Sequence, residues 1–274
     1  MADFEWRKFG DFSEDRIERL KETATRSIDD FTVSFVLGDE LWGSGTLVDV
    51  SGTLGILTAF HVARDLVRHG DRDLAMIIAR HFHRFDLPRE CFEHVPIGTP
   101  TRGEEQGPDL SFLHLFESPA LATIKSKKSF YRIREKPLGE LEQLPLENLF
   151  WWIAGAPASR ASRGGPKSRQ GALNIIHLVG QANFVRLVAG EDDFDILTLS
   201  INSGEPPFAM DYGGCSGGGV WASALAKDPA IGDESLDISP ALLAGVIYYQ
   251  SPEIDRRRDI LANGPGSLTK IALR

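Results

Sequence analysis

The sequence predicts an all-β protein made of two successive sets of about six short strands. Short apolar runs separated by Gly, Asp and Pro recur from Phe31 onward, as in sheets of short antiparallel strands. The polar stretch Lys136–Asn148, which carries two prolines, divides these runs into two groups. The runs do not alternate with helices, and no repeat of fixed period is visible. Two barrels or sandwiches therefore fit better than a βαβ array.

The first group of expected strands lies within residues 31–38, 44–50, 52–60, 74–80 and 110–116. The second group lies within residues 149–155, 172–180, 183–190, 194–201, 218–225 and 241–250. One helix is expected before them, because Ile17, Leu20, Ala24 and Ile28 recur at helical spacing and Ser13 can act as N-cap. We expect this helix to dock on the strands rather than to bind a partner.

These boundaries give four segments. An N-terminal extension with the helix covers residues 1–29, and a first barrel covers residues 30–135. A connector covers residues 136–147, and a second barrel with a C-terminal segment covers residues 148–274.

Composition narrows the function classes. The 274 residues include 42% hydrophobic and 25% charged residues, which are ordinary values for a globular protein. The net charge of -9 argues against a protein that neutralises nucleic-acid phosphates. The basic stretch at 160–169 is rich in Gly, Pro and Ser, so it is interpreted as a solvated loop. We expect no nucleic-acid partner.

The beginning of the chain and its cysteines bear on location. The first fifteen residues are charged throughout and show no apolar stretch typical of a secretory signal. No apolar run is long enough to span a bilayer. The only cysteines, Cys91 and Cys215, offer no disulfide framework. These features predict a cytoplasmic protein without a membrane partner.

Three short motifs carry residues with catalytic potential. The first, "LTAFH", ends at His61, and the second, "GPDLSFLHL", contains Asp109 just before an expected strand. The third is "GGCSGGG", which contains Cys215 and Ser216 and leads directly into an apolar strand. Glycine is costly to order, so this density indicates a tight turn, or a bare backbone that something can approach.

In order and spacing these motifs resemble those of the chymotrypsin/trypsin-like serine peptidases, especially bacterial members without a signal peptide. That family has "GSG…LTAAH", then Asp before an alternating apolar strand, then "G-x-S-G-G". The matching segments here are 43–45, 58–61, 109–113 and 214–218, within a resemblance that covers about residues 30–255. The resemblance implies a chymotrypsin-like double β-barrel with a cleft between the barrels.

The resemblance also implies a catalytic triad of His61, Asp109 and Ser216 for peptide-bond hydrolysis. His61 would take the proton of the nucleophile, and Asp109 would orient the ring and stabilise the imidazolium. The amides of Gly214 and Ser216 would form the oxyanion hole. Such a triad needs no cofactor, and none is expected.

Either Cys215 or Ser216 could be the nucleophile, because some viral relatives of this fold use cysteine. Two glycines follow Ser216 directly, as the family register requires, whereas Cys215 would break that register. Ser216 is therefore preferred. Cys215 then stands where secreted relatives carry the aspartate that pairs with a newly cleaved amino terminus, so activation by such cleavage is not expected.

The pocket residues are implied by the same alignment. Met210 would line the base of the pocket, with Asp211 beside it, while Tyr248, Tyr249 and Gln250 would narrow its entrance. Methionine at the base of the pocket argues against a strict preference for Arg or Lys as the substrate residue that enters it. The carboxylate of Asp211 could still bind a basic substrate side chain.

No metal site is predicted. His81, His83, Cys91 and His94 lie near one another in the sequence, but their spacing matches no common zinc pattern. The sequence therefore predicts a trypsin-like serine endopeptidase that acts on protein or peptide substrates, under the control of narrow specificity or of a partner protein. The alternatives are a catalytically inactive protease-fold binding protein and a structural adaptor with chance motifs.

Overall fold

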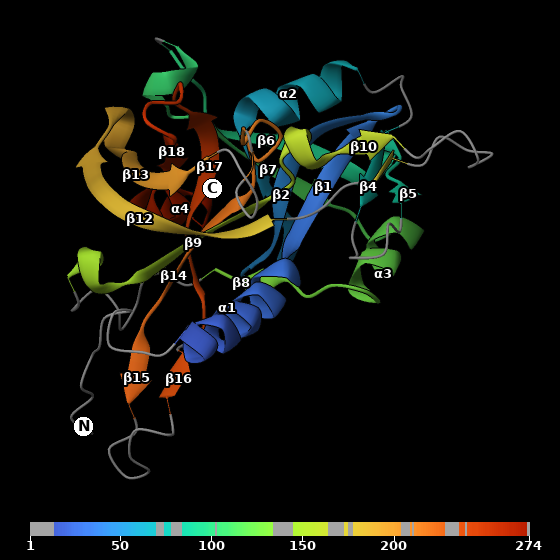
Figure 1. The fold of residues 1–274 in the computed structure, drawn as a ribbon. Coiled ribbons are helices and arrows are strands. Elements are labelled where there is room, and N and C mark those ends of the chain that lie inside the picture. The colour runs from blue at the N-terminus through green and yellow to red at the C-terminus, as the bar shows by residue number, and fades with distance from the viewer. Residues whose placement is uncertain are drawn as a thin grey trace.

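The structure is a computed structural model, described here for residues 14–69, 74–77, 84–101, 103–133, 145–163, 173–174, 178–203, 209, 211–227, 236–238 and 240–272. Its strands form a closed six-stranded barrel, an eight-stranded sheet and two small two-stranded sheets. Figure 1 shows the barrel strands β12, β13 and β18 gathered on one side and β1, β4 and β5 on the other.

The eight-stranded sheet comes from the first half of the chain and runs in the order β5-β4-β1-β2-β3-β7-β6, with β8 paired to β2. Its strands are β1 (Thr32–Leu37), β2 (Glu40–Val50), β3 (Thr53–Thr58), β4 (Leu74–Ile77), β5 (Arg84–Asp86), β6 (Phe92–Gly98), β7 (Leu110–Leu115) and β8 (Tyr131–Arg132). Neighbours pair antiparallel except β2 and β8, which are parallel.

The closed barrel comes from the second half and runs in the order β12-β13-β18-β17-β14-β9. Its strands are β9 (Phe150–Gly155), β12 (Leu178–Ala189), β13 (Asp195–Asn202), β14 (Gly219–Ser223), β17 (Leu242–Gln250) and β18 (Arg257–Asn263). The two small sheets pair β10 (Ser162–Arg163) with β11 (Leu173–Asn174), and β15 (Leu225–Lys227) with β16 (Leu236–Ile238).

Four α-helices and five single-turn 3-10 helices complete the described part of the chain. The α-helices are α1 (Glu14–Asp29), α2 (Phe60–Arg68), α3 (Pro119–Lys125) and α4 (Pro265–Ala272). The 3-10 helices are η2 (Arg89–Cys91), η3 (Glu104–Gln106), η5 (Leu146–Asn148), η6 (Ala158–Arg160) and η7 (Glu191–Asp193). No described helix is long and apolar enough to cross a membrane.

The architecture is all-β with an N-terminal helix, as expected, and its closed barrel and second large sheet are consistent with a chymotrypsin-like double barrel. The first half shows an eight-stranded sheet without a closing pair among the described strands, whereas the second half closes fully. The connector expected at 136–147 and the proposed cap Ser13 fall mainly or wholly outside the described residues.

Helix α1 docks as its apolar spacing predicts. Leu20, Ala24 and Ile28 are buried in one cluster with side chains from both halves of the chain. The end of the helix is held by Lys128, whose Nζ donates to the Asp29 carbonyl oxygen at 2.6 Å. Helix α1 lies against β1, β12 and β16, and Figure 1 shows it below the labels of β1 and β12.

Helix α4 is fixed to the barrel by Asp195, at the start of β13. The Asp195 carboxylate accepts hydrogen bonds from the Gly266 amide at 2.9 Å and from the Ser267 amide at 2.6 Å. The Ser267 hydroxyl also donates to this carboxylate. Asp195 thus caps the first turn of α4, where an anion is favoured by the helix dipole.

We expect Asp195→Ala to lower the free energy of unfolding by about 1–2 kcal/mol, because two helix amides lose their acceptor. Asp195→Asn keeps a capping oxygen and loses the charge, so its effect is expected to be smaller. Urea unfolding of the wild type, Asp195→Ala and Asp195→Asn measures both changes in the free energy of unfolding. Equal stability of Asp195→Ala and the wild type would contradict this role for the cap.

Candidate active site

His61 and Asp109 are brought together by the first half of the chain. His61 lies in the first turn of α2, directly after β3, and Asp109 lies directly before β7, which pairs with β3. The His61 Nδ1 atom lies 2.6 Å from Asp109 Oδ2. The His61 backbone amide donates to Asp109 Oδ1 at 3.0 Å, so both carboxylate oxygens hold the same residue.

The environment of this pair favours the roles that the sequence predicts. The Asp109 side chain is fully buried, and its carboxylate accepts two hydrogen bonds from His61. A buried carboxylate that accepts from Nδ1–H leaves Nε2 as the ring nitrogen that can take a proton. The His61 side chain keeps 19% exposure, so its ring is partly open to solvent.

Ser216 lies in the glycine turn that precedes β14, against β2 of the other half. The Ser44 amide donates to the Ser216 carbonyl oxygen at 2.8 Å. A Cβ atom placed on Gly43 would lie 2.8 Å from Val62 Cγ1 and 3.3 Å from the Ser216 oxygen. Gly43 is therefore in contact both with the residue after His61 and with Ser216.

The three candidate residues are not joined into a continuous hydrogen-bond chain. His61 bonds to Asp109, but among the described residues no hydrogen bond joins His61 and Ser216. Catalytic hydrogen bonds are often long in an empty site and shorten when substrate binds.

The turn around Ser216 leaves two of its amides without a hydrogen bond to the described residues. Four of its amides donate to protein oxygens, and they belong to Gly213, Cys215, Gly217 and Gly218. Within the described turn, the amides of Gly214 and Ser216 make no hydrogen bond. These are the two donors that the sequence predicts for an oxyanion hole.

Glycine is required in this turn for two separate reasons. Gly214 and Gly217 have φ angles of +87° and +88°, which disfavour any other residue. In addition, a side chain on Gly217 would overlap the Ser44 carbonyl oxygen and the Thr58 hydroxyl, and one on Gly218 would overlap the Ala154 carbonyl oxygen. The glycines thus permit both the turn and its close approach to β2, β3 and β9.

The two candidate nucleophiles point to different environments. Cys215 is 1% exposed and belongs to the apolar core of the second barrel, and a Cβ on Gly155 would lie 3.1 Å from Cys215 Cβ. Ser216 is partly exposed. A buried thiol in apolar surroundings is a poor nucleophile, which favours Ser216.

Ser44 ties the turn to the first half of the chain. Its hydroxyl donates to the Gly214 carbonyl oxygen at 2.7 Å and accepts from the Ala156 amide at 2.9 Å. Its carbonyl oxygen accepts from the Thr58 hydroxyl at 2.8 Å. A single residue of β2 therefore contacts two separate segments of the second half, around Ala156 and at the glycine turn.

The residues expected to line a substrate pocket differ in their placement. Asp211 Oδ1 accepts from the Gly213 amide at 2.9 Å, and Gln250 Oε1 accepts from the Tyr212 amide at 2.8 Å. Both side chains therefore support the loop before Ser216. Tyr249 is half-buried, and Met210 lies outside the described residues.

Tyr248 is part of the packed interior. It is 2% exposed within the core of the first half, and a Cβ on Gly107 would lie 3.2 Å from its hydroxyl. Burial, and next the negative charge of Asp109, raise the pKa of Tyr248. Its phenol therefore stays neutral across the ordinary pH range.

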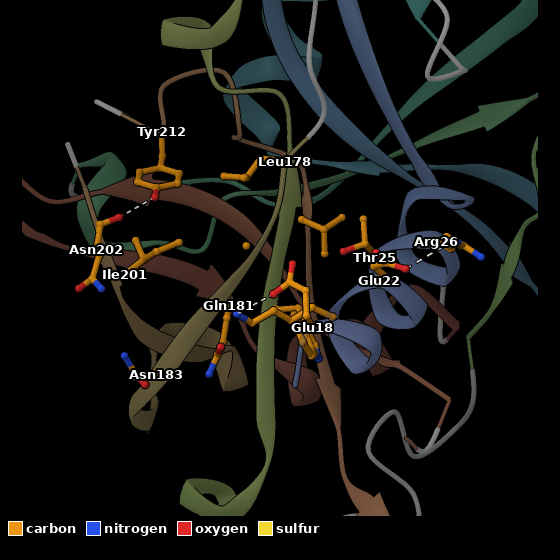
Figure 2. A pocket seen from close by; sticks show the side chains of 14 residues that line it. Glu18, Glu22, Thr25, Arg26, Leu178, Gln181, Asn183, Ile201, Asn202 and Tyr212 are labelled. Carbon is orange, nitrogen blue, oxygen red and sulfur yellow. Dashed lines mark hydrogen bonds and ion pairs between the residues drawn. The ribbon is translucent and has the colours of Figure 1, made fainter. Parts of the chain in front are cut away.

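One pocket, of about 690 Å³, lies between α1 and the closed barrel. Figure 2 shows Glu22 and Arg26 on its helix side and Gln181 and Tyr212 on its barrel side. His61, Asp109 and Ser216 do not line it, so it is separate from the candidate site. Its link to that site is Tyr212, whose carbonyl oxygen accepts from the Cys215 amide at 3.0 Å.

Of the residues weighed as metal ligands, Cys91 and His94 are described, and His81 and His83 are not. No cluster of three or more possible ligands occurs within the described residues. His94 instead shares a 2.9 Å hydrogen bond between its Nε2 atom and the Ser111 hydroxyl. Its ring also lies 5.9 Å from that of Phe60, the neighbour of His61.

His94 makes stability depend on pH. Burial, and then the positive charge of Arg89, lower the pKa of His94. The unfolded chain therefore binds a proton at this residue more readily than the folded chain, and stability is lost as pH falls below about 6.5, the ordinary histidine value.

We expect His94→Gln to remove this contribution, because glutamine can bond to Ser111 and does not titrate. The unfolding free energy of the variant relative to wild type should rise as pH falls from 8 to 5, as measured in urea. His114→Gln is the matched control for a second histidine of the same sheet. A difference between His94→Gln and wild type that is constant with pH would contradict this assignment.

Comparison with models of known protein families finds no match, and comparison with curated protein sequences finds none either. Among solved structures, a thermostable serine protease, AL20, from an extremophilic microorganism is 12% identical, with a TM-score of 0.46 over 88% of this chain and 94% of that one. A structure from work on the coupled folding and binding of the intrinsically disordered VPg protein of Sesbania mosaic virus is 13% identical, with a TM-score of 0.45 over 95% of this chain and 91% of that one. Similarity of this degree assigns no function to this chain.

Proposed function

We propose that this protein is a serine endopeptidase in which His61, Asp109 and Ser216 carry out hydrolysis of peptide bonds. The observation that carries the proposal is the buried Asp109 carboxylate, which lies 2.6 Å from His61 Nδ1. It is supported by the glycine turn, where the amides next to Ser216 are bonded and those of Gly214 and Ser216 are left to a substrate.

In the proposed reaction the Ser216 hydroxyl oxygen attacks the carbonyl carbon of the scissile bond, and His61 Nε2 takes the hydroxyl proton. Asp109 stabilises the resulting imidazolium. The negative charge on the former carbonyl oxygen is met by the Gly214 and Ser216 amides, and one such donor contributes about 3–4 kcal/mol in a well-studied protease.

The tetrahedral intermediate then loses its amine, to which His61 returns the proton, and an ester to Ser216 remains. Water attacks this ester with His61 again as base, and the acid product and the free Ser216 hydroxyl are restored. Every step uses groups of this chain, a substrate peptide and water.

The site supports activity without cleavage of the chain. Cys215, at the position where secreted relatives carry an aspartate, is buried in the barrel core and has a thiol in place of a carboxylate. The turn holds its shape through Asp211, Tyr212 and Ser44 instead. A cytoplasmic peptidase of this kind would have to be narrow in specificity or controlled by a partner, so limited, regulated proteolysis is the proposed role.

The test is labelling of the intact protein with a biotinylated fluorophosphonate, with its N-terminus checked by mass spectrometry. The expected result is one adduct per chain, located on Ser216 by peptide mapping and absent in His61→Ala. Cleavage of a casein substrate should follow the same pattern. A folded wild-type protein that neither labels nor cleaves a broad peptide library would overturn the proposal, in favour of a protease fold used for binding.

A further inference from the structure

The position of Asp109 depends on a residue of the opposite half of the chain. Asn263, at the end of β18, is 1% exposed, and Asp109 is fully buried. The Asp109 amide donates to Asn263 Oδ1 at 3.2 Å, and Asn263 Nδ2 donates to the Asp109 carbonyl oxygen at 2.7 Å. One carboxamide therefore binds both polar groups of the Asp109 main chain.

This pairing fixes the orientation of the Asn263 side chain. A main-chain amide only donates and a carbonyl oxygen only accepts, so one placement of Oδ1 and Nδ2 satisfies both bonds. Apart from glutamine, with its additional methylene, no other side chain offers an acceptor and a donor in this planar arrangement. An apolar residue would leave two buried main-chain groups of Asp109 without partners, which is costly.

Asn263 is itself held rigidly. Its main chain pairs with Ile196 of β13 on one side and with Val246 of β17 on the other, inside the closed barrel. The neighbouring strand approaches so closely that a Cβ on Gly245 would lie 2.5 Å from the Asn263 carbonyl oxygen. The carboxamide therefore projects from a fixed strand onto Asp109.

Asp109 is consequently held at four atoms, two by Asn263 and two by His61. Its carboxylate oxygens accept from the His61 amide and lie against Nδ1, while its main chain is bound across the two halves. A shift of the Asp109 main chain would move the carboxylate relative to the imidazole. Misplacement of reacting groups by about 1 Å can cost roughly 100-fold in rate.

We propose that Asn263 is a positioning residue of the active site, which sets the Asp109–His61 geometry from the second barrel. The effect of Asn263 on catalysis rests on the proposed peptidase function. Its effect on His61 is a property of the fold and can be measured whether or not the protein is an enzyme.

The experiment uses the full chain with Asn263→Leu, which has similar volume and no polar atoms. We expect kcat/KM to fall about 10- to 100-fold through kcat, with KM little changed. We also expect the low-field proton resonance of His61 Nδ1 to weaken or move upfield, and the pKa of His61 to fall, since the imidazolium loses part of its carboxylate partner. His61→Ala assigns the resonance.

Asn263→Gln keeps the carboxamide. Compared with Asn263→Leu, it should recover part of kcat and bring the His61 Nδ1 proton resonance closer to that of the wild type. Asn183→Leu makes the same change on exposed β12 and controls for the substitution itself. If Asn263→Leu does not fold, Asn263→Gln and the smaller Asn263→Ala carry the same measurements. Urea unfolding confirms that each variant tested is folded.

The outcomes separate the two proposals. An unchanged His61 pKa and Nδ1 resonance in folded Asn263→Leu would overturn the positioning role, whatever the activity. A shifted resonance and pKa with reduced kcat supports it. A wild-type protein that is inactive, yet whose His61 resonance depends on Asn263, supports the positioning role and rejects the peptidase function.

Discussion

Ser216→Ala is expected to reduce kcat for peptide hydrolysis by about 10⁶-fold, the loss seen when the nucleophile of a triad is removed. His61→Ala should give a loss of the same order, and the double variant little more, because the two residues act as a unit. The reason is structural: Ser216 is the partly exposed member of the Cys215–Ser216 pair, and its own amide makes no hydrogen bond within the described turn.

Cys215→Ala is the matched comparison. The Cys215 side chain lies in the barrel core, so its removal should lower stability by about 1 kcal/mol and leave most of the hydrolysis in place. Steady-state assays on one fluorogenic peptide, with urea unfolding of each protein, measure both effects. Activity that survives in Ser216→Ala and disappears in Cys215→Ala would reverse the choice of nucleophile.

Asp109→Asn is expected to lower kcat by about 10⁴-fold without loss of the fold. Asparagine has nearly the shape of aspartate, so the two main-chain bonds to Asn263 can persist. It cannot stabilise an imidazolium. Its amide group would also donate to His61 Nδ1, so the ring would carry its proton on Nε2, where Ser216 needs an acceptor.

The pH dependence of kcat/KM gives a second measure of the effect of Asp109→Asn. In wild type, kcat/KM should rise as His61 loses its proton, and Asp109→Asn should move that rise to lower pH because the anionic partner is gone. Asp255→Asn, at the exposed turn between β17 and β18, is the control for the same chemical change. An Asp109→Asn variant with full activity would mean that the 2.6 Å contact has no catalytic role.

Strands in which apolar residues alternate with polar ones, or follow one another without interruption, could be predicted. Burial of one or both faces of such a strand leaves this pattern in the sequence. The strand that completes the barrel, β18, could not. Its sequence "RRDILAN" begins with three charged residues, which lie at the more exposed end of the strand. Strand β6 was not predicted from the sequence either, because it contains Pro96 and proline argues against a strand.

The candidate site could be proposed from the sequence because His61, Asp109 and Ser216 each lie in a short motif. Asn263 has no such signal. It is one asparagine after an unrecognised strand, beyond the segment that resembles the peptidase family, and its role depends on a contact 154 residues away. The burial of Tyr248 was equally hidden, since the sequence does not say which face of β17 meets the other half of the chain.

The contact between Asp109 and Asn263 also bears on synthesis of the protein. When the ribosome has translated residue 216, all three proposed catalytic residues are present in the nascent chain. Strand β18 has not yet been translated, so Asp109 lacks its two hydrogen bonds to Asn263. The barrel itself cannot close before that strand, because β18 lies between β13 and β17. The nascent chain therefore passes through most of translation with an open barrel and without the two hydrogen bonds that Asn263 makes to Asp109.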